Sequence, residues 1–198
     1  MERNLASINP FKVGRNIPEE FFCDREEETA TLIKHVQNGR NVALISPRRL
    51  GKSGLIAHLF RQPEIGQQYY TFYVDIYSTS SVSELVYAWS KELHKQLAPI
   101  KTPWTEQFFK VLSSLRVGFK LDTISGEPTL DLGLGDIKNP DVTLDEIFDY
   151  LEAADKPCIV AIDEFQQICH YQEKNIEALL RTYIQHCSNA DFIFAGSE

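Results

Sequence analysis

Residues 42–53 read VALISPRRLGKS, in which an apolar run of four residues leads into a loop that ends in Gly51, Lys52 and Ser53. The residues that follow, 55–60 (LIAHLF), are compatible with a helix. A strand that turns sharply into a helix leaves the first backbone N–H groups of that helix unpaired, and these groups attract anions. The stretch therefore predicts a cradle for nucleotide phosphates, with the Lys52 ammonium near the β- and γ-phosphates and the Ser53 hydroxyl on Mg²⁺.

The loop departs from the G-x-x-x-x-G-K-[ST] pattern at its first position, where Ser46 replaces glycine. That glycine eases the turn out of the strand, whereas the close backbone approach, the positive charge and the metal ligand come from the last three residues of the pattern. We expect the phosphates to lie against Ser46, Pro47, Arg48, Arg49, Leu50, Gly51, Lys52, Ser53 and Gly54. The alternative is a surface turn followed by a core helix.

A second motif, residues 158–164 (CIVAIDE), is a continuous apolar run that ends in two acids. Such a run is typical of a central parallel strand that is buried on both faces. In P-loop NTPases the first acid at the end of this strand, here Asp163, holds Mg²⁺ beside the P-loop serine. Glu164 then lies where a carboxylate polarises an attacking water. On the alternative interpretation, the two acids cap the strand and begin a solvated loop.

The pair Asp163 and Glu164 also indicates which class of P-loop protein the sequence fits. GTPases carry an N-K-x-D string that recognises guanine, and this string does not occur in the sequence. Small-molecule kinases usually have no catalytic glutamate next to the metal-binding aspartate. The pair therefore favours ATP hydrolysis, with Glu164 and Lys52 as the catalytic residues.

Composition sets the remaining limits. With 198 residues and 43% hydrophobic content, the chain can bury one substantial core, so we expect a single α/β domain over residues 1–198. A net charge of −8 argues against broad contact with nucleic acid. The sequence has no run of about 18 apolar residues and no signal peptide, which predicts a cytoplasmic protein without a membrane segment. The cysteines fit no zinc spacing and are expected to be reduced thiols, at Cys23, Cys158, Cys169 and Cys187.

Helix and strand signals alternate along the chain, after an irregular arm over residues 1–25. Three helices are predicted by a capping signal, in which aspartate, serine or threonine is followed three residues later by glutamate. They run from Asp24 to Val36, from Ser81 to about Leu97 and from Thr143 toward Ala154. Two more helices are expected, one starting at Thr102 and Pro103 and one over residues 176–187. Strands are expected at residues 42–45, 69–76, 158–162 and 192–198.

Residues 117–135 change to an alternating apolar pattern around the sequence SGEP at residues 125–128, which is a β-hairpin signature. A parallel sheet does not need this hairpin, so we expect an insertion that projects from the core. It is either a packing flap or an element that contacts a partner or another copy of the chain.

Three strings resemble those of a known group of proteins: SPRRLGKS at residues 46–53, DEFQ at residues 163–166 and FCDRE at residues 22–26. They are similar to strings of the prokaryotic ATPases of the AAA+/STAND type, and the resemblance covers nearly the whole chain. It implies a P-loop NTPase fold, a three-layer sandwich with a mainly parallel sheet, and ATP with Mg²⁺ at the carboxyl ends of the strands. It also implies an ATPase core that acts as a nucleotide-dependent switch for attached domains.

The resemblance implies further site residues. Phe21, Phe22 and Arg25 would lie on the adenine side of the site, unless they form only a hydrophobic staple and a helix cap. Ser197 would sense the γ-phosphate, unless it belongs to a frayed end. Arg181 would act across a subunit interface as an arginine finger, unless it is a solvated helix residue.

For four other polar residues, the sequence does not decide between a role in the site and a purely structural or solvent-exposed position. Arg48 and Arg49 lie in the cradle loop, where each contacts phosphate, a neighbouring subunit or only solvent. Asp75 ends the second strand and Gln166 follows the acid strand, so each either orients water or Mg²⁺ or caps its strand.

Members of this group continue through a fifth strand, a helical lid and often a winged helix, so the resemblance implies an N-terminal fragment of a longer protein. In addition, a buried type of strand over residues 192–198 leaves its neighbour strand unaccounted for. Self-association through the nucleotide face is one hypothesis, and the protein partner is unknown. Two other functions stay open, namely a module that holds ATP or ADP without hydrolysis and the ATPase subunit of a DNA-transaction machine.

Overall fold

Four parallel strands form one sheet within the part of the chain that the computed structural model describes, residues 22, 24–97, 99–100, 102–105, 119–121, 128–130 and 140–197. The order of the strands across the sheet is β1-β6-β5-β2. Their bounds are Val42–Ile45 for β1, Tyr70–Asp75 for β2, Cys158–Asp163 for β5 and Ala190–Gly196 for β6. Each of the predicted strands is confirmed, with ends that differ by no more than two residues.

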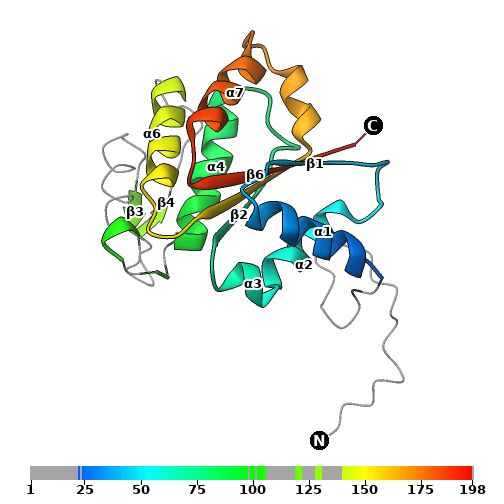
Figure 1. The fold of residues 1–198 in the computed structure, drawn as a ribbon. Coiled ribbons are helices and arrows are strands. Elements are labelled where there is room, and N and C mark those ends of the chain that lie inside the picture. Colours follow the sequence, from blue (N-terminus) through cyan, green and yellow to red (C-terminus); the bar gives the residue numbers. More distant parts are fainter. Residues whose placement is uncertain are drawn as a thin grey trace, which may run out of the picture.

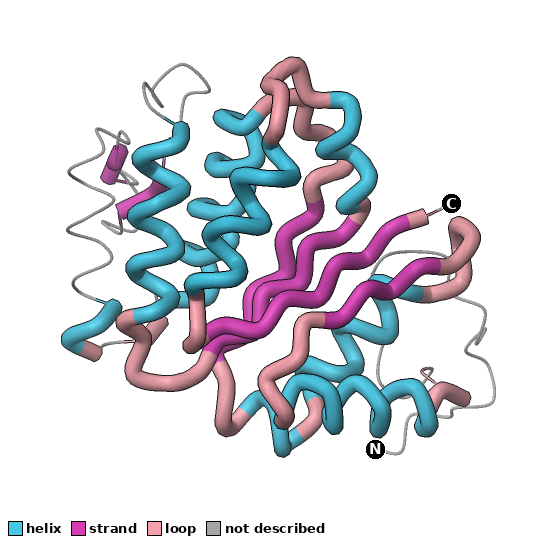
Figure 2. The backbone as a smooth tube through the Cα atoms, turned by 45° about the horizontal axis from the view of Figure 1, so that its top comes forward, coloured by secondary structure: helices cyan, strands magenta, loops and turns pink. Residues whose placement is uncertain are grey.

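Helices cover both faces of this sheet (Figure 1). On one face lie α1 (Glu26–Gln37), α2 (Lys52–Arg61) and α3 (Pro63–Gly66). On the other face lie α4 (Val82–Leu97), α6 (Pro140–Glu152) and α7 (Ile176–His186), and a 3₁₀ helix, η3 (Phe165–His170), follows β5. Figure 2 shows the strands running between these two layers. The fold is therefore the three-layer α/β sandwich that the sequence predicts.

The central strand β5 divides the core between the two faces. All six of its residues are buried. Cys158, Val160 and Ile162 pack into the core that α4, α6 and α7 cover, whereas Ile159 and Ala161 pack into the core beneath α1, α2 and α3. Successive side chains of a strand point to opposite faces, so a strand that is covered on both sides has to be apolar throughout. This explains the unbroken apolar run before Asp163.

The expectation that the last strand lacks a neighbour is wrong, because β6 lies between β1 and β5. Ile193 of β6 pairs with Val42 on one side and with Ala161 on the other. The two edge strands of the described sheet are instead β1 and β2, each of which pairs with only one other strand there. Ile45 at the end of β1 is 65% exposed. The strand that leads into the loop before α2 is therefore an edge strand of the described sheet.

One of the three predicted capping signals works as expected. The Ser81 hydroxyl accepts a hydrogen bond from the Glu84 backbone N–H at 3.3 Å at the start of α4. The capping box at Asp24 is wrong, because Asp24 has a left-handed φ of 57° and no side chain caps α1. The start at Thr143 is also wrong, since α6 begins three residues earlier at Pro140. Proline is favoured in the first turn of a helix, where its missing N–H is not needed.

The predicted hairpin and the helix after Thr102 are present. β3 (Phe119–Leu121) pairs antiparallel with β4 (Pro128–Leu130). Residues 103–105 are helical, and the Thr105 N–H donates to Thr102 Oγ1 at 3.2 Å, which caps their first turn.

Several other predictions concern single residues or segments. Most of the N-terminal arm, residues 1–21, lies outside the described residues, and so does Cys23. Cys158, Cys169 and Cys187 are free thiols, as expected. In the described part of the chain, no helix combines the length and the apolar character that a membrane crossing requires.

Candidate functional site

The two motifs and Ser197 meet at one edge of the sheet, where the parallel strands end. β1 ends at Ile45, immediately before the loop, and Ile45 pairs with Gly196, the residue before Ser197. β5 ends at Asp163, which pairs with Ala195 of β6. Parallel strands align their carboxyl ends, and this edge is where open α/β sheets bind ligands.

The loop between β1 and α2 is shaped to receive an anion. Arg49 and Gly51 adopt left-handed φ angles of 67° and 76°. Such residues turn successive backbone N–H groups toward one concave side of a loop. Gly51 precedes α2, and no side chain caps the first turn of this helix, so its N–H groups stay available to a ligand. A Cβ at Gly51 would meet nothing within 4 Å, so the backbone angle and not crowding requires glycine there.

Lys52 ties this loop to the end of β6. Its Nζ donates to the Ser46 carbonyl oxygen at 2.8 Å and to Ser197 Oγ at 3.2 Å. Ser46 Oγ and the Pro47 carbonyl oxygen each lie 3.3 Å from Nζ. All of these acceptors are neutral, whereas phosphate oxygens are charged and form stronger hydrogen bonds with an ammonium. The ammonium is therefore held at the loop by bonds that phosphate oxygens would replace.

Asp163 is a buried carboxylate that three donors hold in one orientation. Ser53 Oγ donates to its Oδ2 at 2.6 Å, and the Tyr73 hydroxyl donates to the same oxygen. The Glu164 backbone N–H donates to its Oδ1 at 2.9 Å. Asp163 is only 5% exposed, so these bonds offset the cost of burying its charge. Burial, and then the bond to Asp163, raise the pKa of Tyr73, which keeps its hydroxyl protonated as a donor.

The oxygen atoms of Ser53 and Asp163 fit a magnesium ion. A hydroxyl and a carboxylate are hard oxygen ligands, the type that Mg²⁺ prefers. In proteins this ion usually takes one or two side-chain ligands and completes its shell with waters and substrate phosphates. Ser53 adjoins Lys52 at the start of α2, so the ligand pair lies beside the loop that is shaped for an anion.

Glu164 is fixed by its backbone and by Gln166. It adopts a left-handed φ of 59°, which is uncommon for a residue other than glycine. Gln166 Nε2 donates to Glu164 Oε2 at 2.6 Å, and Gln166 Oε1 accepts from the Ser197 N–H at 3.1 Å. A Cβ at Gly196 would lie 3.1 Å from Gln166 Oε1, so glycine leaves room for this side chain. Gln166 therefore joins the end of β5 to the end of β6.

Phe22 and Arg25, which precede α1, contact α2 and the loop before it. Arg25 Nη2 donates to the Leu50 carbonyl oxygen of the loop at 2.5 Å, and Arg25 Nε lies 4.0 Å from Glu28 Oε1. Phe22 stacks on His58 of α2 with ring centroids 4.0 Å apart. The structure thus brings Arg25 to the loop and Phe22 to His58 of α2, whereas Phe21 lies outside the described residues.

The remaining candidates are two arginines in the loop, one arginine on α7 and the aspartate at the end of β2. Arg48 and Arg49 are exposed in the loop, and Arg181 is exposed on α7. Asp75 Oδ1 accepts a hydrogen bond from the Tyr77 N–H at 3.0 Å, which is a capping contact after β2. Tyr73 is not among the predicted site residues, because its position on β2 gives no signal until the pairing of β2 with β5 is known.

Comparison with known proteins identifies the fold. No family model and no curated protein matches the chain. A Walker-type ATPase of Pyrococcus abyssi has a similar structure, with 23% identity, a TM-score of 0.52 and a match over 90% of this chain and 46% of its own. The ORC2 protein of Aeropyrum pernix, solved as ADPNP-ADP complexes, has 13% identity, a TM-score of 0.54 and coverage of 89% and 42%. Cdc6p of Pyrobaculum aerophilum has 12% identity, a TM-score of 0.51 and coverage of 96% and 42%.

These likenesses, all under 25% identity, are likenesses of fold. The chain has the α/β fold of the Walker-type, P-loop ATPases, with a four-stranded parallel sheet within the described residues. It spans less than half the length of each of the three solved structures. The predicted fold class is confirmed.

Proposed function

We propose that the chain binds ATP with Mg²⁺ at the carboxyl ends of β1, β5 and β6 and hydrolyses it. The observation that carries this proposal is the 2.6 Å hydrogen bond between Ser53 Oγ and Asp163 Oδ2. It joins two motifs that lie 110 residues apart in the sequence and that P-loop ATPases use together. Glu164, the next residue after Asp163, is held beside them by Gln166.

Each residue of the site has a role that follows from its chemistry. The backbone N–H groups of the loop bind phosphate oxygens, and Lys52 neutralises charge on the β- and γ-phosphates. Ser53 and Asp163 hold Mg²⁺, which when bound stabilises negative charge on the phosphates. Glu164 orients the attacking water and accepts its proton while the bond from the γ-phosphorus to the leaving oxygen of ADP breaks.

The edges of the site have supporting roles. Ser197 Oγ lies 3.2 Å from Lys52 Nζ, so its hydroxyl would contact the γ-phosphate from the side of β6. Arg25 and Phe22 flank the loop and α2 and would lie on the adenine side. The protein would be cytoplasmic. Hydrolysis of ATP in this domain would change the arrangement of attached domains.

Nucleotide binding tests the first half of this proposal. A fluorescent ATP analogue is titrated with and without Mg²⁺ into the wild-type chain and into Lys52→Ala. We expect saturable binding that Mg²⁺ strengthens and that Lys52→Ala loses. Arg61→Ala, on the last turn of α2, is a matched control that removes a positive charge away from the loop and keeps binding. Absence of binding by the wild-type chain would contradict the proposal.

Phosphate release tests the second half. Wild-type protein is expected to release phosphate from ATP, and Glu164→Gln is expected to bind ATP with similar affinity while its turnover falls by about a hundredfold or more. A chain that binds ATP, releases no phosphate and is unaffected by Glu164→Gln is instead a nucleotide-holding module.

A further inference from the structure

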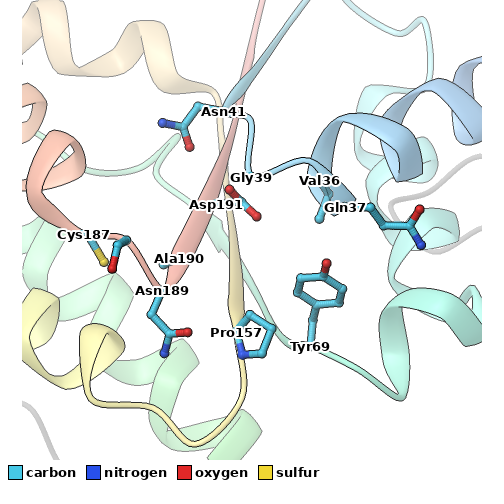
Figure 3. A pocket seen from close by; sticks show the side chains of 11 residues that line it. Val36, Gln37, Gly39, Asn41, Tyr69, Pro157, Cys187, Asn189, Ala190 and Asp191 are labelled. Atoms are coloured by element: carbon cyan, nitrogen blue, oxygen red, sulfur yellow. The ribbon is translucent and has the colours of Figure 1, made fainter.

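A pocket lies at the opposite end of the sheet from Lys52. It has a volume of about 310 Å³ and opens between the end of α1 and the amino ends of the strands (Figure 3). This volume is at the lower end of the range for small-molecule sites. The lining residues that matter for its chemistry are Val36, Gly39, Tyr69, Cys187, Asn189 and Asp191.

Asp191 is the only residue with an ionised side chain among the described residues that line this pocket. It is half-buried on β6, and neither a hydrogen bond nor an ion pair joins its carboxylate to the rest of the chain within the described part. Its Oδ1 lies 4.0 Å from the place that a Cβ at Gly39 would take. Burial raises the pKa of Asp191 from 3.8 to about 6. The carboxylate is thus partly desolvated without a partner, which is a costly state for a charge.

The facing wall supplies an aromatic ring. Figure 3 shows the Tyr69 and Asp191 side chains reaching into the same space. Burial, and then the Asp191 charge, raise the pKa of Tyr69, so its hydroxyl stays protonated. A cation gains energy both from a carboxylate and from the face of an aromatic ring. Burial also raises the pKa of Cys187 to about 12, so this thiol adds no charge of its own at neutral pH.

Two helices end at this pocket. The last two residues of α1, which ends at Gln37, line the cavity, and so does Cys187, the residue directly after α7. The carboxyl end of a helix carries partial negative charge and favours cations. The Asn189 amide nitrogen donates to the Leu151 and Ala154 carbonyl oxygens at 3.2 and 2.9 Å, which leaves its amide oxygen as an acceptor. The Asp191 carboxylate, the carboxyl ends of the two helices and the Asn189 amide oxygen therefore all favour a positively charged ligand.

We infer that this pocket binds an organic cation with a primary ammonium or guanidinium group, for which Asp191 is the counter-ion and Tyr69 the aromatic wall. The cation comes either from a free amine or from a lysine or arginine side chain of another protein. Both sources present the same group to the pocket, and the pocket lies apart from the nucleotide site.

Titration followed by backbone amide NMR tests this inference. The probes are agmatine, a capped Gly-Arg-Gly peptide and a capped Gly-citrulline-Gly peptide, whose side chain is a neutral analogue of arginine. We expect saturable shifts of the Gly39 and Asn189 amides with one or both cationic probes and none with citrulline. Stronger binding of the arginine peptide indicates a protein side chain as the ligand, and binding of agmatine alone indicates a free amine.

Variants assign the binding to the pocket. Asp191→Asn is expected to weaken binding of the cationic probe by about tenfold or more, since it removes a charge-assisted contact. Asp149→Asn, on the exposed side of α6, is expected to leave binding unchanged. Tyr69→Leu keeps the carboxylate and should weaken binding through loss of the ring. The inference is overturned if no cationic probe gives saturable shifts, if citrulline binds equally well, or if Asp191→Asn binds like the wild type.

Discussion

Gln166 and Glu164 are joined by a 2.6 Å hydrogen bond from the amide nitrogen of Gln166 to the carboxylate of Glu164. The amide oxygen of Gln166 accepts from the Ser197 backbone N–H at 3.1 Å, and Ser197 Oγ in turn accepts from Lys52 Nζ at 3.2 Å. A continuous chain of contacts therefore runs from Lys52, through the end of β6, to the proposed base Glu164. A ligand that displaces Lys52 from Ser197 would therefore affect the residue whose backbone N–H holds Gln166, and through Gln166 the position of Glu164.

Replacement of Gln166 by alanine should reduce turnover more than nucleotide binding. Gln166 is a positioning residue on this proposal, because its side-chain hydrogen bonds go to Glu164 and to the Ser197 backbone. We expect Gln166→Ala to lower kcat for ATP hydrolysis by about tenfold, with KM and the affinity for a fluorescent ATP analogue nearly unchanged. Steady-state phosphate release and equilibrium binding measure the two quantities.

The neighbouring glutamine provides the control. Gln167 Nε2 donates to the Thr79 carbonyl oxygen at 3.1 Å, away from Glu164. Gln167→Ala should therefore keep kcat. If Gln166→Ala and Gln167→Ala lower kcat equally, or if Gln166→Ala leaves it unchanged, the hydrogen bond to Glu164 has no part in turnover.

Tyr73 should support metal binding through Asp163. Its hydroxyl donates to the carboxylate oxygen that Ser53 also contacts, so Tyr73→Phe leaves Asp163 less firmly oriented. Loss of a residue that orients a metal ligand typically costs at least tenfold in metal affinity, and we expect about tenfold here. A Mg²⁺ titration of nucleotide binding measures the effect. Tyr77→Phe, at a side chain that is 54% exposed, is the matched control and should titrate like the wild type.

Part of the arrangement of these residues could be predicted from local sequence motifs. The rest depends on which strands are neighbours in the sheet and on their register. Asp163 ends one strand and Ser53 follows the loop after another, so alignment of parallel strands predicts that both lie at the same edge of the sheet. The role of Tyr73 depends on the register in which Tyr73 pairs with Ala161, two residues before Asp163. Gln166 likewise depends on β6 being the neighbour of β5. Neither the register of β2 with β5 nor the adjacency of β5 and β6 can be predicted from a single stretch of sequence.

Capping at α1 failed for a different reason. An N-cap side chain needs an extended backbone to reach the N–H groups of the first turn, whereas Asp24 has a left-handed φ of 57°. The residues before α1 make tertiary contacts instead. Phe22 stacks on His58, and Arg25 donates a hydrogen bond to the Leu50 carbonyl oxygen. Tertiary contacts here override a local sequence signal.

Asp191→Asn should stabilise the protein at neutral pH. The pKa of Asp191 is raised from 3.8 to about 6 by burial, so between these values the folded state binds more protons than the unfolded state. Stability therefore falls as the pH rises through this window, and asparagine removes the penalty. We expect a gain of about 1 kcal/mol above pH 7, less than the full shift implies because the carboxylate is only half-buried. Denaturant unfolding near pH 8 should show this gain, and it should vanish below about pH 4. Lower stability of Asp191→Asn near pH 8 would contradict an unpaired carboxylate.

Gly51→Ala should separate backbone strain from nucleotide binding. Gly51 has a φ of 76° and a Cβ there would meet nothing within 4 Å, so alanine costs only the strain of the left-handed conformation. That cost is about 1–2 kcal/mol, and a relaxed loop would turn its N–H groups away from the phosphates. Gly39→Ala has nearly the same backbone angle, at φ 63°, but lies at the other end of the sheet. Both variants should lose similar stability in denaturant unfolding, while only Gly51→Ala weakens ATP binding, by about tenfold or more. Equal ATP affinity in the two variants would remove the loop from the nucleotide site.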